Sequence, residues 1–213
     1  MNCKGEIPET ILEIAGDMDK ATGLVATSEI SHATPAAFGS HSPVRYCVAE
    51  IARQYIEETK VDVVLGGGVY NSSDEYNCQQ FTKAYNQLLS NEAMAELAEK
   101  NGYYVVDTTK EMMTAAHSGN RKILGMFTGY YEGKTPEMFR LNEYGLTDAK
   151  GKRYDDYPED EPTLAETTET ALDTLELEQD GFFLMVRIPN RLGRPRQIPR
   201  LPDGRDARLR QSR

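Results

Sequence analysis

A helix followed directly by a buried strand is encoded in SPVRYCVAEIARQYIEETKVDVVL, residues Ser42–Leu65. Ser42 has the side chain of a helix N-cap, and Pro43 is a residue type favoured at the first helical position. Apolar residues then recur at helical spacing to about Glu58. Val61–Leu65 is short and rich in valine, the pattern of a strand covered on both faces. This segment therefore predicts one helix–strand unit of an α/β protein.

The same alternation continues on both sides of this unit. Further helices are predicted at Glu9–Lys20, Asn91–Lys100 and Pro162–Glu178, and further strands at Gly23–Thr27, Tyr103–Asp107, Lys122–Phe127 and Gly181–Val186. Ser28–Pro43 is predicted to be a loop, and Thr128–Glu161 a polar surface excursion. The predicted fold class is α/β, with a parallel-sheet core and helices on both faces.

Composition limits the class of protein. The 213 residues are 39% hydrophobic and 27% charged, so the chain can bury a core and is not disordered overall. No apolar run reaches the roughly 18 residues of a membrane span. The N-terminal MNCKGEIPET has no signal-peptide pattern. Three cysteines allow at most one disulfide, and their spacing is not that of a zinc knuckle.

Composition changes abruptly after Val186. Residues 187–213 hold nine arginines, two aspartates and four prolines, a net charge of +7 that leaves the first 186 residues at −17. The tail has neither helical nor strand periodicity. We therefore divide the chain into an α/β domain at 1–186 and a basic Arg/Pro-rich tail at 187–213, which we expect to be disordered or out of frame. The acidic domain argues against a nucleic-acid partner unless the basic tail is real.

Polar residues gather after the predicted strand Gly23–Thr27. Ligands of a parallel sheet bind beyond the carboxyl ends of its strands, and this region contains His32, Thr34, His41 and Arg45. Imidazole and hydroxyl groups are ligands for divalent metals. An arginine in the first turn of the following helix would bind phosphate beside free backbone N–H groups. The alternative is that these are ordinary surface residues, as polar loop residues usually are.

Two other features carry weaker signals. Gly66–Gly68 follow a strand but lack the Gly-Lys-Ser/Thr of a nucleotide P-loop, so we interpret them as a tight strand-end turn. His117 has no nearby partner in the sequence and is interpreted as a surface residue. The sequence has no Gly-x-Ser-x-Gly elbow and no His-Glu-x-x-His motif.

Thr22–His41, TGLVATSEISHATPAAFGSH, followed by Arg45, resembles the alkaline phosphatase family. Five further segments resemble it in the same order: ETILEIA (Glu9–Ala15), VDVVLGGG (Val61–Gly68), ILGMF (Ile123–Phe127), PTLAETTETAL (Pro162–Leu172) and GFFLMV (Gly181–Val186). The resemblance covers roughly residues 6–186, and HATPAA with the downstream arginine is specific.

The resemblance implies a phosphate monoester hydrolase that uses two Zn²⁺ ions, one Mg²⁺ ion and a phosphoserine intermediate. Arg45 matches the phosphate-binding arginine, and Thr34 matches the threonine that ligates magnesium. His32 matches a position, aspartate or histidine in the family, next to that third metal. Cys47 matches a disulfide cysteine of some members, but no partner follows at the family's distance. The resemblance also implies a homodimer and a periplasmic or extracellular location.

The chain departs from the family at both ends. The family's nucleophilic serine and first metal aspartate precede the segment that resembles ETILEIA. After GFFLMV the family continues Glu-Gly-x-x-Ile-Asp-x-x-x-His, which supplies metal ligands, whereas this chain has RIPNRLGRP at Arg187–Pro195. We therefore expect a domain incomplete at both ends that is by itself inactive or nearly so. An alternative is a fragment completed by a second chain that bears the serine segment.

A shifted reading frame would account for the tail. Codons compatible with Arg187–Gln197, read from their second base, give Gly-Ser-Gln-Ile-Asp-Trp-Ala-Gly-His-Ala, with the family's aspartate and histidine four residues apart. We therefore interpret the tail as a frameshift. The rival interpretation is a non-catalytic anion- or nucleic-acid-binding module that uses the tail, and deleting residues 187–213 would then abolish salt-dependent binding.

Overall fold

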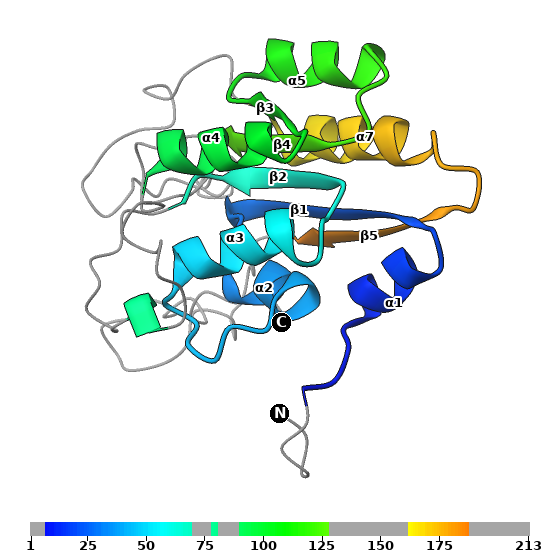
Figure 1. The fold of residues 1–213 in the computed structure, drawn as a ribbon. Helices are drawn as coiled ribbons and strands as arrows, with labels where there is room; N and C mark the ends of the chain where they lie inside the picture. The colour runs from blue at the N-terminus through cyan, green and yellow to red at the C-terminus, as the bar shows by residue number, and fades with distance from the viewer. Residues whose placement is uncertain (1–6, 70–77, 81–89, 128–161, 188–213) are drawn as a thin grey trace, which may run out of the picture.

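Helices and strands alternate along the chain in the computed structural model, which describes residues 7–69, 78–80, 90–127 and 162–187 (Figure 1). The elements follow in the order α1 (Ile11–Asp17), β1 (Ala21–Glu29), α2 (Ala33–Gly39), α3 (Val48–Glu57), β2 (Val63–Gly67), the 3-10 turn η2 (Cys78–Gln80), α4 (Asn91–Lys100), β3 (Tyr104–Val106), α5 (Thr109–His117), β4 (Ile123–Phe127), α7 (Leu164–Leu175) and β5 (Phe182–Arg187).

The five described strands form one parallel sheet in the order β3-β4-β2-β1-β5. β1 lies between β2 and β5, with Leu24 opposite Val64 on one side and Met185 on the other. Every residue of β1 from Thr22 to Ser28 is buried, as expected of a strand covered on both faces. The predicted α/β class with a parallel sheet is confirmed.

Helices cover both faces of this sheet. Successive side chains of a strand point to opposite faces, so Leu24 joins one core cluster and Val25 joins the other. The Leu24 cluster includes buried residues of α1, α2, α3 and α4, whereas the Val25 cluster includes buried residues of α5 and α7. Figure 1 shows α5 and α7 on one side of the strands and α2 and α3 on the other.

Capping boxes set where the first and last described helices begin. Thr10 Oγ1 accepts a hydrogen bond from the Glu13 N–H (3.2 Å), and the Glu13 carboxylate accepts one from the Thr10 N–H (2.7 Å). Thr163 and Glu166 repeat this arrangement at the start of α7. Both helices are shorter than predicted, and the chain leaves α1 through Asp19 at φ 56°.

Two described helices, α2 and α5, were not predicted from the sequence. The predicted loop Ser28–Pro43 contains α2, which has only seven residues and is too short to show a period. Pro35 is compatible with it because the first-turn N–H groups of a helix have no partner within the helix. α5 buries only Met112 and Ala115, so its apolar pattern is faint.

The surface excursion predicted at Thr128–Glu161 and all of the tail beyond Arg187 lie outside the described residues. The domain boundary at 186, the frameshift and the rival basic arm therefore stay predictions. Within the described ranges, no helix combines the length and the apolar character needed to cross a bilayer.

Candidate functional site

Gly66–Gly68 lie beside the carboxyl end of β1. Gly66 and Gly67 extend β2, and none of these three glycines has a positive φ, so the predicted tight turn is wrong. A Cβ on Gly66 would lie 3.0 Å from the carbonyl oxygens of Ala26 and Ser28. Glycine is needed here because two backbones approach closely where β1 begins to leave the sheet.

His32 and Thr34 lie at the start of α2, directly after β1. His32 is the half-buried N-cap residue, and its carbonyl accepts a hydrogen bond from the Ala36 N–H (2.9 Å). Thr34 is exposed in the first turn of the helix. Tyr55 of α3 supports this segment, because its hydroxyl donates to the Ile30 carbonyl (3.2 Å). The structure thus places both predicted metal-site residues at the carboxyl edge of the sheet.

The helix predicted from Pro43 begins five residues later, at Val48. Ser42 does not act as an N-cap, because its hydroxyl donates to the Val44 carbonyl (3.0 Å). The Cys47 N–H also donates to the Val44 carbonyl (3.0 Å), which closes a turn before the helix. Arg45 therefore lies in this turn and not in the first turn of α3, so the predicted help from the helix N-terminus is wrong.

Arg45 presents its charge to solvent. The side chain is exposed, and the guanidinium carbon lies 5.2 Å from the ring centroid of Tyr46, an arrangement that favours a cation over the ring face. No carboxylate within the described ranges forms an ion pair with Arg45. The turn that contains Arg45 lies at the carboxyl edge of the sheet. The helix α3 begins after this turn and must run back to the amino end of β2, because β1 and β2 are parallel.

His41 is not part of this group. Its Nε2 lies 2.9 Å from both carboxylate oxygens of Glu13, which ties the segment after α2 to α1. Burial raises the pKa of Glu13, but hydrogen bonds from Thr10 and His41 outweigh burial and leave that pKa below its usual value. His117 is exposed at the end of α5, which confirms its interpretation as a surface residue.

Cys47 forms a disulfide with Cys78, 31 residues further along the chain. Both cysteines are buried. The three cysteines allow at most one disulfide, and the structure forms it away from the family's expected spacing, because η2 comes back to the start of α3 and brings together two cysteines that are distant in sequence. The disulfide fixes the residue that immediately precedes α3, two residues after Arg45.

Arg187, at the end of β5, reaches the same edge of the sheet. It pairs with Ala26 in register, and its Nη1 donates a hydrogen bond to Ser28 Oγ. Burial lowers the pKa of the Arg187 guanidinium, and the charge of Glu29 opposes that effect. Sequence analysis did not single out Ser28 or Glu29, since only the pairing of β1 with β5 brings them to Arg187.

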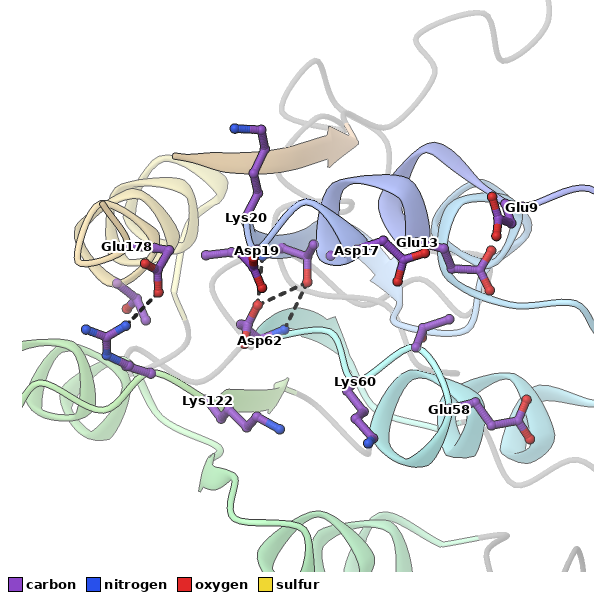
Figure 2. Close-up of a pocket in the computed structure, with 16 residues that line it drawn as sticks. Glu9, Glu13, Asp17, Asp19, Lys20, Glu58, Lys60, Asp62, Lys122 and Glu178 are labelled. Atoms are coloured by element: carbon purple, nitrogen blue, oxygen red, sulfur yellow. Dashed lines mark hydrogen bonds and ion pairs between the residues drawn. The ribbon is translucent and has the colours of Figure 1, made fainter. Parts of the chain in front are cut away.

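A polar hollow of about 570 Å³ lies at the opposite, amino edge of the sheet (Figure 2). Asp62 lies in its wall and accepts hydrogen bonds from the backbone N–H (2.8 Å) and hydroxyl (3.1 Å) of Thr22. Arg121 pairs there with Glu178 at 2.7 Å. These contacts hold the starts of the strands together. The hollow contains neither His32, Thr34 nor Arg45 and is not part of the candidate site.

Comparison with known proteins gives the family. The profile of the alkaline phosphatase family matches residues 2–188. This chain belongs to the alkaline phosphatase family. The family acts on phosphate monoesters, and the match contains His32, Thr34, Arg45 and Arg187.

Related alkaline phosphatases are much longer than the matched region. Alkaline phosphatase 3 of Bacillus subtilis (strain 168) is 36% identical over 189 residues, which covers 85% of this chain and 32% of that protein. Alkaline phosphatase 4 of the same organism is 33% identical with the same coverage. The crystal structure of the Thermus thermophilus alkaline phosphatase superposes with a TM-score of 0.60 at 28% identity and covers 86% of this chain and 32% of that one. The chain thus spans about a third of the length of these relatives.

The metal ions that the family implies need more ligands than the described residues bring together in one place. A solved mutant of the TAB5 alkaline phosphatase has Mg bound in its M3 site. Zinc sites use three or four nitrogen, sulfur or oxygen ligands, and magnesium takes six oxygens. Across the described parts of this chain, no three His, Cys, Asp or Glu side chains cluster closely enough to hold a metal ion. These residues do not by themselves fit the Zn²⁺ or Mg²⁺ sites of an alkaline phosphatase.

Proposed function

We propose that this chain supplies the phosphate-binding part of a phosphate monoester hydrolase of the alkaline phosphatase type. In the intact enzyme Arg45 would bind the phosphate, and His32 and Thr34 would lie beside the third metal, for which the described residues of this chain do not supply a ligand set. The family match over residues 2–188, with these three residues at one edge of the sheet, is the observation that carries the proposal.

The exposed guanidinium of Arg45 suits an anion from solution. Its planar N–H groups can donate two parallel hydrogen bonds to phosphate oxygens, an arrangement that a lysine ammonium cannot copy. The ring of Tyr46 restricts the side chain, so less conformational freedom is lost on binding. The absence of an ion-paired carboxylate among the described residues leaves the charge of Arg45 available to a ligand.

Phosphate binding tests the role of Arg45 directly. Calorimetric titration of the 213-residue chain with inorganic phosphate should give weak, saturable binding. Arg45→Ala should reduce the affinity for phosphate by about tenfold or more, because hydrogen bonds to charged groups contribute about 1.5–3 kcal/mol. The affinity of Arg45→Lys should lie between those of wild type and Arg45→Ala. Lys100→Ala is the matched control, since Lys100 is also an exposed cation and lies at the end of α4. Equal losses in the Arg45 and Lys100 variants would refute the proposal.

The 213 residues by themselves should hydrolyse phosphate monoesters at or near the background rate. The described residues lack a metal ligand set, and the reaction of the family depends on its metal ions. The measurement is release of 4-nitrophenol from 4-nitrophenyl phosphate with zinc and magnesium present. Turnover abolished both by Arg45→Ala and by a chelator would overturn the expected inactivity. Turnover that survives Arg45→Ala would come from a contaminating phosphatase.

We further propose that the protein resides in an oxidising compartment, the periplasm or the cell exterior, and forms a homodimer. The Cys47–Cys78 disulfide supports the first part, because disulfides persist in oxidising compartments and are rare in the cytosol. Thiol labelling after cell fractionation tests it: both cysteines should resist labelling until reduced. The homodimer rests on the family resemblance, and sedimentation of the purified protein tests it.

A further inference from the structure

Arg187 places a positive charge at the corner where β5 meets the carboxyl end of β1. The residue is half-buried, and its Nη1 donates to the hydroxyl oxygen of Ser28, which is 1% exposed. Backbone pairing with Ala26 fixes the position from which the side chain extends. The hydrogen bond therefore ties the guanidinium to the carboxyl end of β1.

The same corner contains a carboxylate. Glu29 follows Ser28 at the end of β1, and its charge counters the effect of burial on the pKa of the Arg187 guanidinium. An arginine side chain stays protonated in proteins even when burial lowers its pKa. Ser28, Glu29 and Arg187 therefore form a local set in which the cation is hydrogen-bonded to a hydroxyl oxygen and lies near enough to a carboxylate to interact with it electrostatically.

A divalent cation would compete with this guanidinium for the same oxygens. Magnesium is coordinated by oxygen atoms of carboxylates, carbonyls and water. Here the hydroxyl oxygen of Ser28 already accepts from Arg187, and Arg187 lies near enough to Glu29 to interact electrostatically. A cation bound to the Ser28 hydroxyl would also be repelled by the positive charge of Arg187, which donates to that same oxygen.

We infer that Arg187 supplies the positive charge of this corner and excludes a divalent cation from it. β1 and β5 then hold their carboxyl ends together through Arg187 and Ser28, without a bound metal. The inference goes beyond the proposed function, since it concerns metal binding and folding and does not depend on hydrolysis or on phosphate binding by Arg45.

Calorimetric titration of the full 213-residue chain with MgCl₂ tests the exclusion. Wild type should show no saturable binding. Arg187→Glu should gain saturable binding, since it removes the cation and adds a carboxylate, and Arg187→Gln should bind more weakly than Arg187→Glu. Saturable binding to wild type that Ser28→Ala or Glu29→Gln weakens would overturn the inference, as would a folded Arg187→Glu variant with no gain.

A pair of serine variants tests the link between the strands. Ser28 and Ser31 are both 1% exposed, but only the Ser28 hydroxyl bonds to Arg187, and Ser31 Oγ has no hydrogen-bond partner within the described ranges. Ser28→Ala should lower Tm by several degrees, whereas Ser31→Ala should leave it nearly unchanged. Equal shifts would overturn the inference. Failure of phosphate titrations at Arg45 would leave these results intact, so the two proposals fail separately.

Discussion

Glu50 is a carboxylate inside α3 with 2% of its surface exposed. Arg53 donates to it through Nε (2.8 Å) and Nη2 (2.7 Å), and Gln54 Nε2 donates at 2.8 Å. The hydrogen bonds that Arg53 donates to Glu50, and then those to Glu57 and Glu58, outweigh burial and raise the pKa of Arg53 above its usual value. The buried charge of Glu50 is tolerated because it is both paired and hydrogen-bonded.

Replacing Arg53 by methionine should lower the free energy of unfolding by about 3 kcal/mol, because a buried carboxylate is left without its cation. Arg121→Met is the matched control. Arg121 also pairs with a glutamate at 2.7 Å, but 62% of its side chain is exposed, so its loss should cost less than about 1 kcal/mol. Urea unfolding measures both variants. Similar losses of unfolding free energy in Arg53→Met and Arg121→Met would show that the burial of Glu50 does not determine the cost of removing its cation.

Glu13 makes the stability of the protein depend on pH in the acidic range. Its pKa is lowered in the folded protein from the ordinary value of 4.5, because hydrogen bonds from Thr10 and His41 outweigh the burial that raises it. A lowered pKa contributes stability that is fully present above the unfolded-state value and is lost as pH falls through the folded-state value. The free energy of unfolding should therefore fall as pH is lowered below about 4.5.

Glu13→Gln should lose about 1 kcal/mol of stability at neutral pH, because it weakens the capping box and the contact with His41. The same variant should also lose part of the acid dependence of wild type. Glu99→Gln, which removes an exposed carboxylate, is the control and should follow the wild-type pH profile. Urea unfolding at a series of pH values gives the comparison. If the stability of wild type and of Glu13→Gln changed with pH in the same way, Glu13 would not be a source of the acid dependence.

At the scale of elements, we expect glycine-to-alanine substitutions at two positions to change the stability of the protein in opposite directions. Gly66→Ala should lower the free energy of unfolding by about 1–3 kcal/mol, because its Cβ would lie 3.0 Å from the carbonyl oxygens of Ala26 and Ser28. Gly16→Ala in α1 should add about 0.5–1 kcal/mol, since no atom lies within 4 Å of its Cβ position and alanine favours a helix. Thermal unfolding should shift Tm in opposite directions. Shifts of one sign would show that the approach of β1 to β2 does not require glycine.

The elements that could be predicted from sequence are those with strong apolar patterns. Val61–Leu65 and Gly181–Val186 lie in β2 and β5 to within two residues, because buried parallel strands are continuous apolar runs. α2 could not be predicted, because seven residues give too little periodicity. The start of α3 was misplaced because Ser42 donates to a carbonyl, a choice that the residue type does not reveal.

The candidate site was predictable only where neighbours in sequence are also neighbours in space. His32 and Thr34 follow one strand, so their common position at its carboxyl edge could be inferred. The contact between Ser28 and Arg187 spans 159 positions and depends on which strand lies beside β1, which a pattern within one strand does not specify. The Cys47–Cys78 disulfide depends in the same way on where η2 folds back.

At the scale of the whole molecule, the Cys47–Cys78 disulfide closes a loop that includes α3 and β2. The bond joins the start of α3 to η2, so it connects a helix of the Leu24 core cluster to a segment that follows the second strand. In the unfolded chain, the same bond keeps two points 31 residues apart together and lowers the entropy of that state. Its main effect should therefore be on the free energy of unfolding of the entire domain.

Removing this bond should lower the free energy of unfolding by about 3–4 kcal/mol, the loop-entropy value for a closure of this length. The variant is Cys47→Ala with Cys78→Ala, and its urea unfolding is compared with that of wild type with and without a reducing agent. Reduced wild type should approach the double variant, whereas the double variant itself should not respond to reductant. Cys3→Ser controls for the remaining thiol. A double variant as stable as oxidised wild type would show that the unfolded chain gains no freedom from loss of the bond.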